Sequence, residues 1–254
     1  MFPEIVELPE LLIASDWKWR MPAEHGLSGM KHGWWIGVAP DSREWLLKMT
    51  GSFYGYRERV FASLAQRLGI SCQSSTYVII NKNNAILRRE SGDAEPFQLA
   101  ICLMDEHANL PCSSECVARH VLGREMNFQE IAKARDAGLM HLDDLVRGDI
   151  LGHLCGQLEP HGHFITRDHE YVVIDNECMF AQKPCLDQYE WLDVEGIRPV
   201  VIGVCRSLVR VHADELRSLA TVPNVYRVVN GRDLYDDLCA AKTAANEYLE
   251  IFDE

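Results

Sequence analysis

The alternation of apolar and polar residues predicts β-strands in the first part of the chain. Residues 32–39 (HGWWIGVA) and 44–49 (EWLLKM) are separated by a turn-forming Pro-Asp-Ser sequence, and we expect them to pair as a hairpin. Residues 75–80 (STYVII) and 85–90 (AILRRE) predict a second hairpin. The run 97–104 (FQLAICLM) is almost continuously apolar, which is typical of a central strand covered on both faces.

A helical period interrupts these strands. The apolar residues of 56–69 (YRERVFASLAQRLG) recur three and four positions apart, which predicts one buried stripe on a helix that ends at Gly69. Residues 50–55 (TGSFYG), which precede it, are expected to form a loop. The stripe consists of Val60, Phe61, Leu64, Ala65 and Leu68.

After Asp105 and Glu106 the pattern becomes mostly helical, apart from a short hairpin expected from 163–166 (HFIT) and 171–175 (YVVID). This order predicts an α+β, two-lobed protein. Ligands often bind in the cleft between two lobes. The expected helices cover 113–122, 127–137, 141–156 and segments near 199–210, 212–220 and 232–252. The expected lobes are a β-rich N-lobe with one main helix over residues 1–106, and a helical C-lobe over residues 107–254 with a hairpin at 157–177.

The charge balance narrows the classes of partner. The 254 residues include 38 acidic and 25 basic side chains, a formal net charge of −13. A field of this sign repels polyanions, so nucleic acid is disfavoured as a partner and a basic or neutral protein is favoured, as substrate or regulator.

The apolar runs and the cysteines indicate where in the cell we expect the protein. No apolar run approaches the roughly 20 residues of a membrane helix, and Glu4, Glu7 and Glu10 stand where a secretory signal would carry basic residues. The nine cysteines are an odd number and mostly lie in apolar runs, which favours reduced, buried thiols. We therefore expect a cytoplasmic protein that does not bind membranes.

Two opposite charges lie on faces expected to be buried. Lys48 shares a strand face with Leu46, and burying its ammonium is costly without a partner. Glu58 precedes Phe61 by three residues, so it lies on the helical stripe. Such a pair could hold a phosphate oxygen, with the lysine binding it and the glutamate fixing the lysine. The alternatives are an edge-strand lysine that reaches water and an acid favoured by the helix dipole in the first turn.

Polar residues surround the later hairpin. Asp175 ends an apolar strand, where an aspartate facing a cleft is a usual Mg²⁺ ligand, although a turn-forming aspartate fits the same position. The preceding segment 156–166 (GQLEPHGHFIT) is a polar loop. His161 and His163 could instead join cysteines in a zinc site, and Cys112 with Cys116 has the spacing of half such a site.

These pieces, in this order, resemble the protein-kinase-like fold. The similarity is greatest to the HipA-like kinases, followed by the phosphatidylinositol kinases and actin-fragmin kinase. It covers roughly residues 25–185 and is most specific in WLLKM, YRERVFASLAQRLG and HFITRDHEYVVIDNECMF. The resemblance implies an ATP-binding phosphotransferase that uses Mg²⁺.

The resemblance also implies roles for individual residues. Lys48 matches the lysine that contacts the α- and β-phosphates of ATP, Glu58 matches its helical partner, and Asp175 matches the metal-binding acid. Other matches concern nucleotide binding alone. Met104, Asp105 and Glu106 match the hinge whose backbone meets adenine, and Ser28 and Gly29 lie where a phosphate-covering loop is expected.

The catalytic loop departs from the kinase pattern. Leu158 stands at the position of the catalytic aspartate, and His163 at that of the asparagine that binds the second metal. Glu159 is the nearest carboxylate and the candidate base, with His163 assisting the metal. Phosphoryl transfer depends mainly on positioning and charge neutralisation, so a changed base need not abolish it. Three functions follow: a kinase acting on protein Ser or Thr hydroxyls, a catalytically impaired pseudokinase that binds nucleotide or protein, and a zinc protein.

Overall fold

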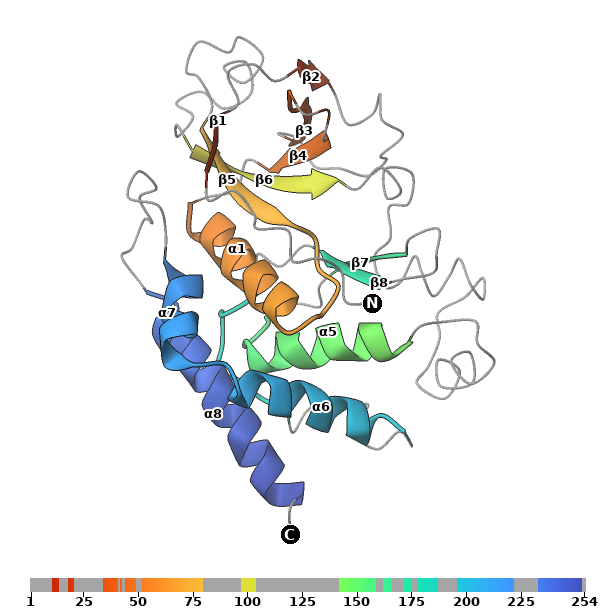
Figure 1. Ribbon diagram of the computed structural model, residues 1–254, viewed down its shortest axis with the longest axis vertical. Coiled ribbons are helices and arrows are strands. Elements are labelled where there is room, and N and C mark those ends of the chain that lie inside the picture. The colour runs from red at the N-terminus through yellow and green to blue at the C-terminus, as the bar shows by residue number, and fades with distance from the viewer. Residues whose placement is uncertain are drawn as a thin grey trace.

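A computed structural model places a six-stranded sheet at one end of the molecule and the helices α5 (Leu142–Leu154), α6 (Arg198–Val209) and α8 (Tyr235–Phe252) at the other (Figure 1). Helix α1 and a two-stranded hairpin lie between them. The structure describes residues 11–13, 18–20, 34–40, 42, 44–48, 52–79, 97–103, 142–158, 162–165, 171–174, 178–186, 196–221 and 233–252.

The sheet confirms the predicted β3–β4 hairpin and the central position of β6. Its order is β1-β5-β6-β4-β3-β2, and every neighbouring pair is antiparallel except β1 with β5. Strands β1 and β2 have three residues each, too few for a periodic signal, and were not predicted. The predicted strand at 85–90 lies outside the described residues, but its expected pairing with 75–80 is wrong, because β5 is flanked by β1 on one side and by β6 on the other. The strands are β1 (Leu11–Ile13), β2 (Lys18–Arg20), β3 (Trp34–Val38), β4 (Glu44–Lys48), β5 (Ser75–Ile79) and β6 (Phe97–Leu103).

Helix α1 (Ser52–Arg67) packs against β5, β6 and α7. It begins four residues before the predicted start, so the expected loop at 50–55 is wrong from Ser52 onward. Phe53 packs against the core from the added turn, and this tertiary contact outweighs the low helix propensity of Gly55. The predicted stop is confirmed. Gly69 has φ +65°, and the N–H of Ile70 donates to the carbonyl of Ala65 at 2.9 Å, closing the helix end.

The second half of the chain agrees with the predicted elements where the structure describes them. Helices α6 and α7 pack against α8, and α5 packs against α6, α8 and β8. The predicted helices 113–122 and 127–137 lie outside the described residues, as does the boundary expected at 106–107, so these stay predictions. The elements are α5 (Leu142–Leu154), β7 (Gly162–Ile165), β8 (Tyr171–Ile174), α6 (Arg198–Val209), α7 (Ala213–Ala220) and α8 (Tyr235–Phe252).

One apolar core joins α1 to the C-terminal helices. Phe61 and Leu64 of α1 are fully buried together with Ile150 of α5. The six cysteines that the structure describes are free thiols, as expected for reduced cysteines, and burial raises the pKa of Cys205 to about 12. Across the described part of the chain, no helix has the length and apolar character needed to cross a membrane.

Candidate functional site

Glu58 is a buried carboxylate, as its place on the stripe predicts. Its side chain is 1% exposed, among the apolar residues of α1. It lies six residues after the first residue of the helix, which excludes the alternative of an acid in the first turn. Taking a carboxylate out of water costs several kcal/mol unless it is paired, so this position requires a polar or cationic neighbour.

Lys48 is the last residue of β4, inside the sheet. Its backbone stands between Trp34 of β3 and Leu99 of β6. Because β6 borders β4 and also packs against α1, Lys48 and Glu58 lie on elements that share one neighbour. The alternative of an edge-strand lysine is therefore wrong, since β4 is flanked on both sides. Contact between the two side chains stays a prediction.

The β7–β8 hairpin is attached to the connection that follows α1. The N–H of Val173 donates to the carbonyl of Ser71 at 2.9 Å, and the N–H of Gln73 donates to the carbonyl of Val173 at 3.0 Å. These two bonds hold β8 beside the end of α1.

The residues before Glu159 run beside those that follow Asp175. Phe180 donates its N–H to the carbonyl of Cys155 at 2.7 Å, and Leu158 donates to that of Cys178 at 3.1 Å. This backbone pairing joins residues 155–158, which end just before Glu159, to residues 178–180, the first described residues after Asp175.

Gly156 makes this pairing possible, and the sequence analysis did not single it out. Its φ is +61°, and a Cβ built there would lie 2.0 Å from the carbonyl oxygen of Gln182. The same Gly156 carbonyl accepts N–H groups from Ala181 and Gln182 at 3.0 and 3.1 Å. Only a glycine combines this left-handed conformation with so close an approach. The local sequence contains no signal for it, because the partner segment lies about 25 residues further on.

Arg57, beside Glu58, is a second residue that the sequence analysis missed. Its Nη2 donates to the carbonyl of Phe180 at 3.4 Å, and its guanidinium lies 4.3 Å from the centre of the Phe53 ring. Phe180 is buried and has a positive φ of 56°, an uncommon conformation for a residue with a side chain. Helix α1 therefore contacts the segment that follows Asp175 directly.

Of the other residues predicted at the site, the structure describes only Leu158 and His163. Leu158 is 61% exposed, and the backbone of His163 pairs with Val173 in the hairpin. The polar loop ends one residue earlier than expected, because β7 begins at Gly162. The predicted residues outside the described part of the chain are Ser28, Gly29, Met104, Asp105, Glu106, Glu159 and Asp175.

The donor set fits a magnesium ion only in part. A carboxylate such as Asp175 provides the oxygen ligands that Mg²⁺ prefers, whereas the imidazole of His163 is a donor typical of zinc and other transition metals. Within the described ranges, no group of three His, Cys, Asp or Glu side chains is placed to hold a metal. The residues named for a zinc site, Cys112, Cys116 and His161, fall outside those ranges.

Comparison with solved structures defines the fold. The chain is similar to the Helicobacter pylori proinflammatory kinase CtkA, with a TM-score of 0.53 and 11% identity over 86% of this chain and 96% of that one. It is also similar to the Golgi casein kinase, with a TM-score of 0.52 and 11% identity over 88% of this chain and 69% of that one. A second structure of that kinase, with Mn/ADP bound, matches with a TM-score of 0.51 and 10% identity over 88% of this chain and 70% of that one.

These likenesses establish a kinase-like fold. At this identity they concern the fold and not the chemistry. No protein-family model matches the sequence, and no curated protein matches it significantly.

Proposed function

We propose that this protein is an ATP-dependent, kinase-like phosphotransferase that uses Mg²⁺ and phosphorylates Ser or Thr hydroxyls of a protein. The observation that carries the proposal is the burial of Glu58, 1% exposed, on the helix that packs against the sheet of a kinase-like fold. A buried acid at this place is accounted for by a cation partner that binds phosphate.

In this proposal the nucleotide lies in a cleft between the strand-rich and helical parts of a two-lobed molecule. Lys48 binds the α- and β-phosphates, and Glu58 holds its ammonium in place. Asp175 is the metal ligand, and bound Mg²⁺ neutralises phosphate charge. The Golgi casein kinase structure that holds Mn/ADP supports a nucleotide and a divalent cation as ligands of this fold.

Two further groups complete the proposed nucleotide site. Met104, Asp105 and Glu106 meet adenine through their backbone, and Ser28 and Gly29 cover the phosphates. Within the kinase-like proteins, we propose that the chain is most closely related to the HipA-like kinases. The acidic chain favours a basic or neutral protein as substrate or regulator.

The connection between α5 and β7 decides how much chemistry the site performs. Leu158 is 61% exposed and cannot accept a proton, so the kinase proposal assigns the base to Glu159, the next residue, and metal assistance to His163. The second candidate function is a pseudokinase, favoured by the same leucine. It would bind nucleotide or a protein partner without transfer.

The test begins with binding and continues with transfer. We expect Mg-ATP to raise the melting temperature of the full chain, and label from γ-phosphate-labelled ATP to appear on the protein or on an added acceptor. A parallel reaction with α-phosphate-labelled ATP separates phosphoryl transfer from nucleotidyl transfer. A melting shift without label transfer supports the pseudokinase.

Matched variants locate the site. Glu58→Gln removes the buried charge and should lower transfer by about 100-fold, because a misplaced lysine loses transition-state contacts. Glu247→Gln, on the exposed face of α8, makes the same chemical change and should leave transfer unchanged. Glu159→Gln should lower transfer by about 100-fold or more, the usual contribution of a general base, and keep the melting shift. If ATP neither shifts the melting temperature nor transfers label, the proposed function is wrong.

A further inference from the structure

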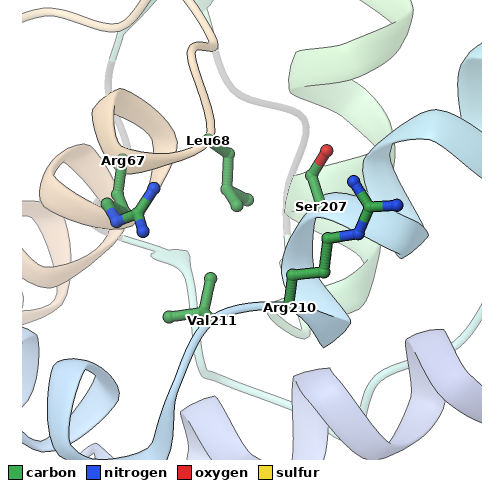
Figure 2. Close-up of a pocket in the computed structure, with 5 residues that line it drawn as sticks. All are labelled: Arg67, Leu68, Ser207, Arg210 and Val211. Atoms are coloured by element: carbon green, nitrogen blue, oxygen red, sulfur yellow. The ribbon is translucent and has the colours of Figure 1, made fainter.

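A cavity of about 290 Å³ lies where α1 and α6 both end (Figure 2). Arg67 of α1 lines one side, and Ser207 and Arg210, at the end of α6, line the other. Leu68 and Val211 lie between the two arginines. The cavity is nine residues along α1 from Glu58, or about 13 Å at the usual helical rise, so it is separate from the proposed nucleotide site.

Two backbone carbonyls at this junction already accept hydrogen bonds from cationic side chains. Two helix C-termini meet here, and their carbonyl ends carry partial negative charge that would repel an anion. However, Arg147 donates to the carbonyl of Leu68 at 3.4 Å, and the ammonium of Lys242 donates to that of Val211 at 2.6 Å. Arg67 and Arg210 are therefore additional to the cations that cap these carbonyls.

The two arginines of the cavity differ in their partners. Arg67 forms a bidentate ion pair with Glu215 of α7, with Nη2 to Oε2 at 3.1 Å, and this pairing lowers the pKa of Glu215. Arg210 is exposed, and its side chain has no hydrogen-bond or ion-pair partner among the residues that the structure describes. Glu215 offsets the charge of Arg67, so Arg210 leaves the cavity with a local positive charge in a chain of net charge −13.

We propose that this cavity binds a phosphate monoester dianion, as a phosphorylated Ser or Thr side chain presents it. Guanidinium groups donate paired hydrogen bonds to phosphate oxygens. Figure 2 shows the guanidinium of Arg210 directed past Ser207 and away from Arg67, so the proposal requires this exposed side chain to turn toward the cavity on binding. Two guanidinium groups on opposite sides then suit a tetrahedral anion better than a planar carboxylate. The hydroxyl of Ser207 donates to the carbonyl of Gly203 at 2.8 Å and can rotate to donate to the ligand. Leu68 and Val211 offer apolar contact to the carbon of the ester.

Binding at this cavity has a structural consequence. A dianion competes with Glu215 for Arg67, and the Arg67–Glu215 pair is one of the links that join α1 to α7. Occupancy therefore loosens α1 from α7. Any effect of this change on phosphotransfer rests on the proposed function, because α1 carries Glu58, whereas the binding itself does not depend on it.

The test uses the full chain and N-acetyl-O-phosphoserine amide, titrated calorimetrically at constant ionic strength. We expect saturable binding in about the millimolar range or tighter. Arg210→Gln should weaken it about tenfold, the loss of one charged hydrogen-bond donor. Arg206→Gln is the matched control, since Arg206 is exposed on the same helix and does not line the cavity, and it should change the affinity less than twofold.

Further variants and probe compounds test the identity of the ligand. Glu215→Gln should strengthen binding, because the competing carboxylate charge is removed. N-acetyl-serine amide should not bind, and saturating ATP should not displace the phosphoserine probe. Equal effects of Arg206→Gln and Arg210→Gln, or the absence of saturation, would overturn the proposal. Inorganic phosphate binding as tightly as the ester would overturn the assignment to a phosphorylated side chain. These results are independent of label transfer, so they can fail while the proposed function stands.

Discussion

The hydroxyl of Tyr56 joins three elements that are distant in the sequence, and its removal tests how α1 is held. The hydroxyl donates to the carbonyl of Ala220, the last residue of α7, at 2.6 Å. It accepts the N–H of Leu234, just before α8, at 3.2 Å. The side chain is 2% exposed, so Tyr56→Phe removes one oxygen and leaves the packing of the ring unchanged.

The expected cost follows from the groups left without a partner. Leu234 is fully buried and Ala220 is 6% exposed, so water cannot readily replace the hydroxyl. An unsatisfied buried polar group costs about 1–3 kcal/mol, and removing the hydroxyl recovers part of its own desolvation. We therefore expect Tyr56→Phe to lower the free energy of unfolding by about 2 kcal/mol.

The stability difference between wild type and Tyr56→Phe should depend on pH. Burial, the largest cause, raises the pKa of Tyr56 above its ordinary value, while the Leu234 N–H acts in the opposite direction. The folded state therefore holds this proton more tightly than the unfolded state. The stability that this bound proton contributes is complete below about pH 10, the ordinary tyrosine pKa, and is lost as the pH rises from there through the pKa of the folded state. The stability difference between wild type and Tyr56→Phe should therefore shrink above about pH 10.

Urea unfolding at neutral pH and near pH 10.5 measures both effects, with an unchanged m-value as the condition for comparing stabilities. Tyr54→Phe is the matched control, because Tyr54 lies on the same helix and is 49% exposed. It should change stability by less than about 0.5 kcal/mol. If Tyr56→Phe costs no more than Tyr54→Phe, the hydroxyl does not hold α1 in the way described.

Three further substitutions, one of them a control, test other contacts of α1 and of the segment around Gly156. Gly156→Ala should lower the free energy of unfolding by at least about 3 kcal/mol, because strain at positive φ adds to a 2.0 Å approach to the Gln182 carbonyl oxygen. Gly69→Ala is the control, because Gly69 has a similar φ of +65° but nothing lies within 4 Å of the added Cβ. It should lower the free energy of unfolding by about 1 kcal/mol. If thermal unfolding shows equal losses of stability for the two variants, the close approach at Gly156 is contradicted. Glu215→Gln should cost less than about 1 kcal/mol, since the pair with Arg67 is solvent-exposed. That difference should be complete above the ordinary Glu pKa of about 4.3 and fade as the pH falls, because Arg67 lowers the pKa of Glu215; a difference that persists at pH 2 would refute the assignment.

Local patterns determined the elements and part of the candidate site. The apolar stripe of 56–69 predicted a buried face, and Glu58 is buried because it shares that face with Phe61. The continuous apolar run at 97–104 predicted the central position of β6. Each of these features depends on residues within a few positions of one another, so the chain itself carries the signal.

Tertiary structure decided which of these elements meet. The sequence could not show that α1 begins at Ser52, because the added turn is accounted for by packing of Phe53 against the core, which forms only on folding. Nor could it show that Gly156 lies against Gln182. Such contacts depend on the path of the whole chain, whereas periodicity records only which face of a single element is buried. For the same reason, Arg67 and Arg210 became candidate ligands of one anion only when folding brought the ends of α1 and α6 to the same cavity.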